Sequence, residues 1–453
     1  MVGTAAAAHL SKLIAVRSRG AGEFGAAEGK PVARDDCQRL SSRPIALVGP
    51  ATGTEGAWSS HDDYSRLVDV NFSSDAVAAA RSIAGYRGVE QETGITFFHE
   101  TGCLVVSNSE IPPGSMADSE AVAAEHMTAL ELQRRWPVLN TIGPASTENR
   151  PAHGLFEPSR AGWMDPRGHV RAHRELAIAK GVHVVEQHVV QVVRDKADVS
   201  NLPTPTLPQW IVRTASGLEL RTERVVFALG AWSNLSGLLP SGLGLPLELW
   251  GKCVYHACIH DEDASALLKL GMPATVIKYA PEHAPAAAVS YTGAKSGFYV
   301  YFFPPVQYSD GRWYVKIGHS PHDPLISALS GTSLADKLSR WMASEGEDVQ
   351  SILAESAAFF QHTLRQILPH ARFDGGRLTT CVTTKTPKGR VFLGPLSSLA
   401  DSDATVDCEG LFACAGCDGA GAKFSHEWGR QVAEVVARTP HGHGSISGFR
   451  SAL

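Results

Sequence analysis

The chain has 453 residues, of which 43% are hydrophobic, 8% aromatic and 19% charged, so it can bury a core and is not a disordered tail. No segment approaches the ~18 consecutive apolar residues of a membrane-spanning helix, and the net charge of −5 excludes a basic nucleic-acid-binding surface over the whole chain. Eight cysteines are too few for a disulfide scaffold and favour free thiols in a reducing compartment. At roughly 150 residues per domain, the length predicts two to three domains.

The N-terminal part of the chain is rich in alanine. Residues 1–19 contain no acid, a composition compatible with an organellar transit peptide, but Ala5–Ala8 also favours the packed helix that we expect here. Residues 20–43 are glycine-rich and lack periodicity, which indicates a loop or insertion. The apolar run 44–50, bounded by prolines, predicts a buried parallel strand, and alanine and valine at helical spacing predict a helix over 74–94.

The middle of the chain alternates between helical and strand patterns. Residues 95–98 and 103–106 predict a small hairpin, and residues 121–136 predict a helix that Pro137 ends. A helix over 168–180 is followed by expected strands at 182–185, 189–193, 210–213 and 224–229. This order is typical of an α/β nucleotide-binding domain. Residues 250–320 are rich in strands and aromatic residues and predict an antiparallel sheet, and 334–367 is expected to be helical.

A glycine-rich turn near the C-terminus carries the most specific chemical signal. The apolar strand Leu411–Ala415 leads into Gly416-Cys417-Asp418-Gly419-Ala420-Gly421-Ala422-Lys423, and a helix follows over 424–437. Three glycines let the backbone approach a ligand closely, and amides at a helix start attract negative charge. Such a turn alone is weak evidence, but Lys423 would be directed at the same ligand.

This turn resembles the C-terminal flavin loop of the sarcosine-oxidase-like branch of the FAD-dependent amine and amino-acid oxidases, the D-amino-acid oxidase superfamily. Four other segments resemble the same family in the same order along the chain. They are Gly162–Ala177, Val226-Phe227-Ala228-Leu229-Gly230-Ala231-Trp232-Ser233, Trp313-Tyr314-Val315-Lys316-Ile317-Gly318-His319 and Cys381-Val382-Thr383-Thr384-Lys385-Thr386-Pro387. Each motif is moderately specific, and together they extend the resemblance from about residue 44 to the end.

The resemblance implies an α/β fold with a discontinuous FAD-binding Rossmann-like (GR2-type) domain and a substrate domain built on an antiparallel sheet with helices. The FAD-binding domain would comprise residues 1–70, 145–240 and 378–453, with 13–43 as an insertion, and the substrate domain residues 71–144 and 241–377. The implied reaction oxidises the C–N bond of a small (secondary) amine or amino acid to an imine and reduces O2 to H2O2. Two alternatives are a same-fold flavin dehydrogenase with another electron acceptor and a non-catalytic relic that has lost FAD.

The residues that the resemblance places against FAD are spread along the chain. They are Gly3, Ser60, His61, Arg66, Val189, Gly230, Ala231, Trp232, Cys381, Gly416, Gly419, Gly421 and Lys423. Cys381 would carry the flavin covalently, although an isolated cysteine is more often a small buried hydrophobe. Gly3 corresponds to the third glycine of a G-x-G-x-x-G fingerprint, whose first strand and first two glycines are missing from this chain. Gly49 replaces the ribose-binding acid, so we expect a truncated gene model or weak FAD affinity.

Five residues are expected at the reaction centre, namely Lys316, Lys423, Arg66, Tyr301 and His319. Lys316 would stabilise superoxide near the flavin N5 atom. Lys423 would bind a substrate carboxylate, and Tyr301 would line the pocket beside His319, which lies one residue short of the family's histidine. The family's second arginine, three residues after Arg66, is replaced by Asp69, which favours an amine without a carboxylate or one with a cationic group.

No metal site is expected. Cys414 and Cys417 lack a second pair at ligand spacing, and His169 and His173 are expected on a solvated helix face. The expected partners are a small amine and O2, with neither nucleic acid nor a membrane. The C-terminal tripeptide Ser451-Ala452-Leu453 resembles a peroxisomal address without its central base, so the location is expected to be cytoplasmic or peroxisomal.

Overall fold

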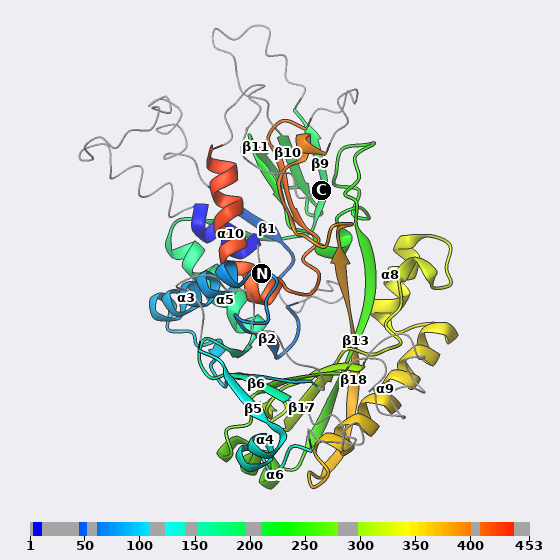
Figure 1. The fold of residues 1–453 in the computed structure, drawn as a ribbon. Helices are drawn as coiled ribbons and strands as arrows, with labels where there is room; N and C mark the ends of the chain where they lie inside the picture. Colours follow the sequence, from blue (N-terminus) through cyan, green and yellow to red (C-terminus); the bar gives the residue numbers. More distant parts are fainter. Residues whose placement is uncertain are drawn as a thin grey trace, which may run out of the picture.

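The computed structural model describes residues 3–10, 45–51, 61–107, 123–140, 153–195, 210–279, 298–399 and 408–438. A group of helices lies on one side of the molecule, and a large sheet covered by further helices lies on the other (Figure 1). The fold is mixed α/β, with both parallel and antiparallel strand pairs, as the sequence predicts.

The group of helices consists of α3 (Ala76–Thr93), α5 (Pro166–Ala179), α10 (Gly421–Arg438) and the helical residues 3–10. The Asp75 carboxylate caps α3 by accepting a hydrogen bond from the Ala78 amide at 2.9 Å, and Asp165 caps α5 ahead of Pro166. A Cβ added to Gly429 would lie 2.6 Å from the Ala5 Cβ. The missing side chain therefore lets α10 pack closely on residues 3–10, which confirms a packed helix there.

Several small sheets border these helices. Strand β1 (Ala46–Gly49) pairs in parallel with β8 (His183–Glu186), and β12 (Val225–Phe227) pairs in parallel with β20 (Leu411–Ala415). Strand β19 (Phe392–Pro395) pairs with β20 on its other side. Another sheet is antiparallel and consists of β9 (Val189–Arg194), β10 (Trp210–Thr214) and β11 (Glu219–Thr222). In a further sheet, β7 (Gly162–Met164) lies between β2 (Arg66–Val68) and β3 (Phe98–His99). The parallel pairs occur where the sequence predicts a nucleotide-binding pattern.

The large sheet has nine strands. Their order is β18 (Phe373–Lys385), β13 (Glu248–Ile259), β17 (Trp313–Gly318), β15 (Phe298–Phe302), β14 (Ala274–Tyr279), β4 (Cys103–Ser107), β6 (His153–Glu157) and β5 (Glu125–Thr128), with β16 (Val306–Gln307) also paired to β17. All neighbours are antiparallel except β14 and β4. The antiparallel sheet predicted for residues 250–320 is therefore confirmed.

The two faces of this sheet differ in chemistry because side chains alternate along each strand. One face contributes apolar residues such as Tyr255, Val315 and Ile317 to a core that also contains residues of the covering helices. These are α4 (Ala129–Arg135), α6 (Asp261–Lys269), α8 (Leu334–Ala343) and α9 (Glu347–Ile367), the last two beside β13 and β18 (Figure 1). The intervening positions, which include His256 and Lys316, belong to the opposite face.

Two local expectations differ from the structure. The segments 95–98 and 103–106 do not form a hairpin, since β3 pairs with β7 whereas β4 pairs with β14 and β6. Residues 125–128 of the expected helix 121–136 are strand β5, and α4 begins only after them. The large sheet includes β6 and part of β18 from segments assigned to the FAD-binding domain, while α3, assigned to the substrate domain, packs with α5 and α10. The domain boundaries stay a prediction.

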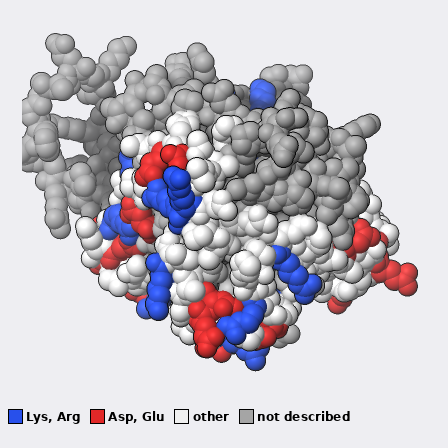
Figure 2. All heavy atoms as spheres, turned by 60° about the horizontal axis from the view of Figure 1, so that its bottom comes forward, with Lys and Arg blue, Asp and Glu red and all other residues white. Residues whose placement is uncertain are grey.

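None of the described helices combines the length and the apolar character that crossing a membrane requires. Figure 2 shows Lys and Arg side chains beside Asp and Glu side chains on the face at the lower end of the sheet. In this region Arg372 pairs with Glu262 at 2.8 Å and with Asp263 at 3.0 Å. Charges of the two signs therefore offset each other locally on this face.

The expectation that His169 and His173 lie on a solvated helix face is wrong, because both side chains are fully buried. Helix α5 packs against α3, and residues of α3, α5 and α10 share one core. The His173 Nε2 atom lies 3.1 Å from His426 Nδ1, and His169 Nε2 lies 3.1 Å from the Ser425 hydroxyl. The described residues hold no group of three or more potential ligands arranged to bind a metal ion.

Burial of this histidine cluster predicts acid sensitivity. Burial, followed by the neighbouring His173, lowers the pKa of His169 well below its usual range. His169 is therefore neutral when folded but titrates near ~6.5 when unfolded, so its stability contribution is present above that pH and is lost as pH falls below it. In urea unfolding followed from pH 8 to 5, we expect the His169→Gln variant to lose stability less steeply than wild type. The exposed control His183→Gln should follow wild type, and equal slopes for all three proteins would contradict this explanation.

Candidate active site

The polar face of the nine-stranded sheet gathers several of the residues expected at the site. Directly paired residues in antiparallel strands lie on the same face, and His256 pairs with Lys316, Lys252 with Cys381, and Tyr301 with Gly318. A Cβ at Gly318 would come within 2.3 Å of the Tyr301 hydroxyl oxygen, so glycine is required for the tyrosine ring to lie across β17. Lys316, Cys381 and Tyr301 therefore point to one side of the sheet.

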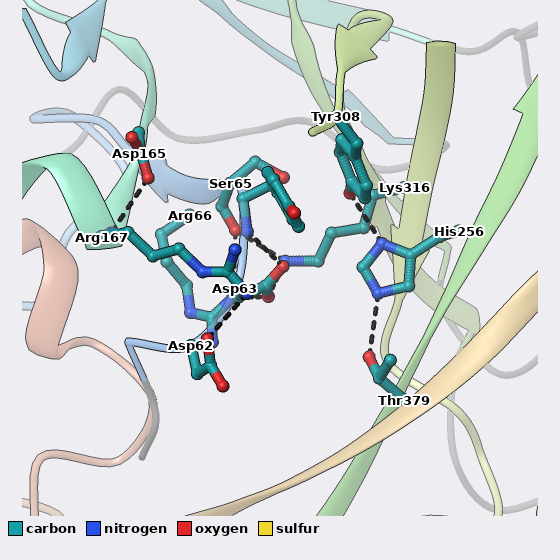
Figure 3. A network of polar contacts seen from close by, with 11 residues as sticks. Asp62, Asp63, Ser65, Arg66, Asp165, Arg167, His256, Tyr308, Lys316 and Thr379 are labelled. Carbon is teal, nitrogen blue, oxygen red and sulfur yellow. Dashed lines mark hydrogen bonds and ion pairs between the residues drawn. The ribbon is translucent and has the colours of Figure 1, made fainter. Parts of the chain in front are cut away.

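Lys316 is a buried lysine whose Nζ atom has two oxygen partners. Its side chain is 2% exposed, and Nζ donates hydrogen bonds to Asp63 Oδ2 and to the Ser65 carbonyl oxygen, each at 2.6 Å (Figure 3). The expected alternative, a lysine on an exposed strand face, is thereby excluded. Both partners belong to the segment that leads into β2, more than 250 residues away in the sequence.

Arg66, at the start of β2, contacts the same carboxylate. Its guanidinium donates to Asp63 Oδ2 and, at 3.1 Å, to the Ser65 carbonyl oxygen. One carboxylate thus accepts from both an ammonium and a guanidinium, and Figure 3 shows the three side chains converging beside β17. Such charge-assisted hydrogen bonds offset the desolvation of the buried groups.

His256 borders Lys316 on β13 and is held in the neutral form. Its Nδ1 lies 2.7 Å from the Tyr308 hydroxyl, and its Nε2 lies 2.8 Å from the Thr379 hydroxyl (Figure 3). Burial first, and then the charges of Lys316, Arg377 and Arg66, lower the pKa of His256 well below its usual range. The imidazole therefore adds no positive charge beside Lys316.

Cys381 and Tyr301 complete this part of the polar face. Burial raises the pKa of the Cys381 thiol, which opposes formation of the thiolate, while Arg66 and Lys316 act in the other direction. Strand β18 is held at this residue by a hydrogen bond of 2.9 Å from Trp341 Nε1 to the Cys381 carbonyl oxygen. Burial also raises the pKa of Tyr301, so its hydroxyl stays protonated and can donate.

Lys423, in the first turn of α10, forms a buried ion pair with Asp69. The Asp69 side chain is fully buried and that of Lys423 is 17% exposed. Burial lowers the pKa of Lys423, but the ion pair with Asp69 outweighs burial and the net shift is upward. The anionic partner expected at this helix start is therefore an internal carboxylate.

Two further side chains lie near this ion pair. Glu157 of β6 accepts hydrogen bonds from the Val70 and Asn71 amides, each at 3.0 Å, and burial raises its pKa to about 7. Tyr299 of β15 has an electrostatic interaction with Lys423, and its ring lies 4.5 Å from that of His319 in an edge-on arrangement. Since Tyr299 and Tyr301 are two residues apart on β15, they connect the surroundings of Lys423 with those of Cys381.

The glycine-rich turn packs against β18. The Asp418 amide donates to the Thr384 carbonyl oxygen at 2.9 Å, and a Cβ at Gly416 (φ +76°) would lie 2.5 Å from Thr386 Cγ2. Gly419, with φ +74°, borders the Thr383 side chain, and Gly421 opens α10. The turn therefore packs against the end of β18, the strand that contains Cys381.

Of the other residues expected against FAD, Gly3, Val189 and the segment Gly230–Trp232 lie near β12 and β9. A Cβ on Gly3 would be 3.2 Å from that of Ala228, so residues 3–10 begin beside the short helix η2 (Gly230–Trp232). Val189 opens β9. Burial lowers the pKa of His61 to about 4. Ser60 lies outside the described residues.

The arrangement fits a flavin ring at the polar face. The Ser65 and Thr383 hydroxyl oxygens are buried, and neither has a hydrogen-bond partner among the residues that the structure describes. Ser65 also accepts a hydrogen bond from Lys316 through its backbone oxygen, and Thr383 lies two residues beyond Cys381 on the same face of β18. Buried hydroxyls without partners are costly, so they mark positions where a polar ligand would bind.

Sequence reasoning missed Asp63, His256, Tyr299 and Glu157. The spacing of Lys252 and His256 was a signal for His256, because two residues four apart in a predicted strand lie on one face. No local pattern indicates Asp63 or Glu157, whose partners are distant in the sequence.

The model of one protein family, described as FAD dependent oxidoreductase, matches residues 2–435. The chain belongs to this family. A search of curated protein sequences found no match for this FAD dependent oxidoreductase. The cofactor expected from the sequence, FAD, is therefore that of the family.

Solved structures with the same fold include NikD, described as an unusual amino acid oxidase essential for nikkomycin biosynthesis, with 19% identity over 97% of this chain and 94% of that chain and a TM-score of 0.60. Iminodiacetate oxidase (IdaA) from Chelativorans sp. BNC1 is 14% identical over 98% and 95% of the two chains, with a TM-score of 0.58. Fructosamine oxidase (Amadoriase II) from Aspergillus fumigatus is 16% identical over 95% and 84%, with a TM-score of 0.56.

Proposed function

We propose that this FAD-dependent oxidoreductase oxidises the C–N bond of a small amine to an imine and passes the electrons to O2, forming H2O2. The observation that carries the proposal is the convergence of Lys316, Arg66, Tyr301 and Cys381 on one polar sheet face. The names of the solved structures above, an amino acid oxidase, an iminodiacetate oxidase and a fructosamine oxidase, support a C–N bond as the target. The resemblance to the sarcosine-oxidase-like branch supports a secondary amine.

Two groups of residues in this chain would hold FAD. Cys381, Thr383 and Ser65 would hold the ring end, and the turn from Gly416 to Gly421 would approach it with backbone amides. Bound FAD would supply the acceptor for the hydride equivalent removed from the carbon beside the nitrogen. The protein itself orients the amine, excludes water and supplies fixed charge.

Lys316 would act on O2. Transfer of the first electron to O2 creates superoxide, an anion, and a fixed ammonium in a dry site stabilises that charge without reorganisation. The Lys316 side chain is 2% exposed, so water does not screen it. Its position on the same face as Cys381 supports this role.

On the substrate side, Asp69 would select against carboxylates. Its carboxylate already pairs with Lys423, so the ammonium that would bind a substrate carboxylate is occupied by an internal one. Glu157 adds a second acid nearby. We therefore propose that the substrate is an amine without a carboxylate beside the nitrogen.

The presence and the attachment of FAD can be tested with one spectrum. Purified protein supplied with FAD is expected to absorb near ~450 nm, and the colour should stay in the pellet after acid precipitation because it is bonded to Cys381. In the Cys381→Ala variant the colour should move to the supernatant. Peroxide should form when a small secondary amine is added aerobically. A colourless protein that takes up no FAD would overturn the proposal and favour a non-catalytic relic.

A flavin dehydrogenase of the same fold is the second candidate. It is favoured by Asp63, whose carboxylate offsets part of the positive charge of Lys316. L-proline dehydrogenase from P. horikoshii, 17% identical over 82% of this chain and 79% of that chain, has the same fold with a TM-score of 0.51. An enzyme that oxidises amines with an artificial acceptor but forms no peroxide with O2 would favour this candidate.

A further inference from the structure

The environment of Lys316 contains few groups able to keep it charged. Asp63, in the segment that leads into β2, and Arg66, the first residue of β2, face it, as do His256 of β13 and Cys381 of β18. The Phe303 ring centre lies 5.2 Å from Nζ. Among these groups Asp63 supplies the negative charge in direct contact.

We propose that Asp63 is a positioning residue for the redox site, whose carboxylate, together with the Ser65 carbonyl oxygen, fixes the Lys316 ammonium in place and keeps it protonated while buried. This inference rests on the proposed role of Lys316 in O2 reduction. It assigns to Asp63 a function that acts through another residue and requires no contact with substrate.

The geometry supports this role. The two acceptors lie 2.6 Å from Nζ, and Asp63 is itself only 8% exposed, so neither ion can exchange its partner for bulk water without local rearrangement. Arg66 also donates hydrogen bonds to the Asp63 carboxylate and the Ser65 carbonyl oxygen, so it helps to hold both acceptors of Lys316 in place. The ammonium is thus fixed by contacts that come from outside its own strand (Figure 3).

The other groups oppose or barely favour the charged form. Burial first, and then the Arg66 guanidinium, lower the pKa of Lys316 well below its usual range, so the charged form depends on the Asp63 carboxylate in direct contact. Cys381 acts weakly in the other direction, but burial keeps its own thiol protonated. His256 is neutral and contributes no negative charge. Without the Asp63 carboxylate, burial and Arg66 would therefore disfavour the protonated form of Lys316, and no negative group in contact with it would compensate.

The Asp63→Asn variant tests the proposal through a pH profile. The asparagine keeps the shape and an acceptor oxygen but loses the charge, so the pKa of Lys316 should fall into the working range. The rate constant for oxidation of the reduced holoenzyme by O2 should then fall as pH rises, by up to ~10-fold per pH unit above the new pKa. Wild type and Asp63→Glu should vary less than about twofold between pH 7 and 9, the range in which a paired lysine stays protonated.

A second readout needs no flavin turnover. A lysine whose pKa is lowered in the folded state binds fewer protons than in the unfolded state, so stability rises with pH up to the unfolded value near ~10.4. We expect the unfolding free energy of Asp63→Asn, measured without added FAD, to rise relative to wild type between pH 7 and 10. A purely structural role would lower stability by the same amount at every pH.

The neighbouring carboxylate Asp62 provides a matched control. It is 45% exposed and pairs with Arg167 at 2.7 Å, away from Lys316 (Figure 3). Asp62→Asn should follow wild type in both measurements. Wild-type profiles for Asp63→Asn would overturn the inference while leaving the proposed function intact, whereas unchanged O2 oxidation in Lys316→Met would overturn the proposed role of Lys316 itself.

If Asp63→Asn alone does not accumulate as folded protein, the double variant Asp63→Asn/Lys316→Met decides the question. It buries neither charge, so it should fold if an unpaired ammonium was the defect. Failure of the double variant to fold would show that Asp63 is needed for another reason, and would overturn the inference.

Discussion

Replacing Lys316 with methionine is expected to slow the oxidation of the reduced enzyme by O2 by about 10²–10³-fold, the loss seen when one preorganised electrostatic group is removed from an anionic transition state. Methionine retains the apolar stem, so the packing beside Phe303 should survive. The measurement is stopped-flow oxidation of anaerobically reduced enzyme mixed with O2. Reduction by amine, measured separately without O2, should change far less.

A matched control separates this effect from general loss of positive charge. Lys269, near the end of α6, is exposed and distant from the polar face, so Lys269→Met should oxidise as wild type does. If Lys316→Met also reacts with O2 at the wild-type rate, Lys316 has no part in O2 reduction and the dehydrogenase candidate gains weight. Asp63 must be intact in this experiment, because it pairs with Lys316.

Much of the fold follows from sequence periodicity. Helices α3, α5 and α10 lie where apolar spacing and the final glycine turn predict helices, and the stretch 334–367 predicted as helical is divided into α8 and α9. The failures are non-local. Residues 95–106 carry two correct strand patterns, but pairing is decided by strands far away in the chain, which local alternation cannot reveal.

The prediction that His169 and His173 are exposed to solvent failed for a related reason. Helix α5 carries polar residues around much of its circumference, so composition favours a solvated face. In the structure, α5 packs with α3 and α10. His173 contacts the His169 carbonyl oxygen and His426, and His169 contacts the Ser425 hydroxyl, so the contacts with α10 exist only once the helices are assembled. A histidine pattern alone does not distinguish these outcomes.

At the candidate site, resemblance supplied the residue types but not their partners. Lys316, Cys381 and Tyr301 were expected together, and the strand register puts them on one face. The carboxylates that pair with the two lysines were not expected as partners. Asp63 is 253 residues from Lys316, and Asp69 was expected to face the substrate rather than Lys423.

Replacing Asp69 with asparagine is expected to change which amines the enzyme accepts. The substitution keeps the side-chain shape but frees the Lys423 ammonium, which could then bind a substrate carboxylate. A charge-assisted hydrogen bond contributes about 1.5–3 kcal/mol, so selectivity for an N-methyl amino acid over the same amine without its carboxylate should rise by about 10- to 150-fold. The measurement is the ratio of kcat/KM for the two substrates in wild type and variant.

The double variant Asp69→Asn/Lys423→Met is the control, because it lacks the freed ammonium and should lose the gain. Binding gives an independent readout. Acetate should raise the melting temperature of Asp69→Asn, whose buried ammonium lacks a counter-ion, but should leave wild type unchanged because Asp69 already fills that role. If acetate stabilises both proteins equally and the selectivity ratio stays constant, Lys423 does not face the substrate. The Asp69–Lys423 pair would then only join the segment after β2 to the start of α10, and the preference for amines without a carboxylate would lose its physical basis.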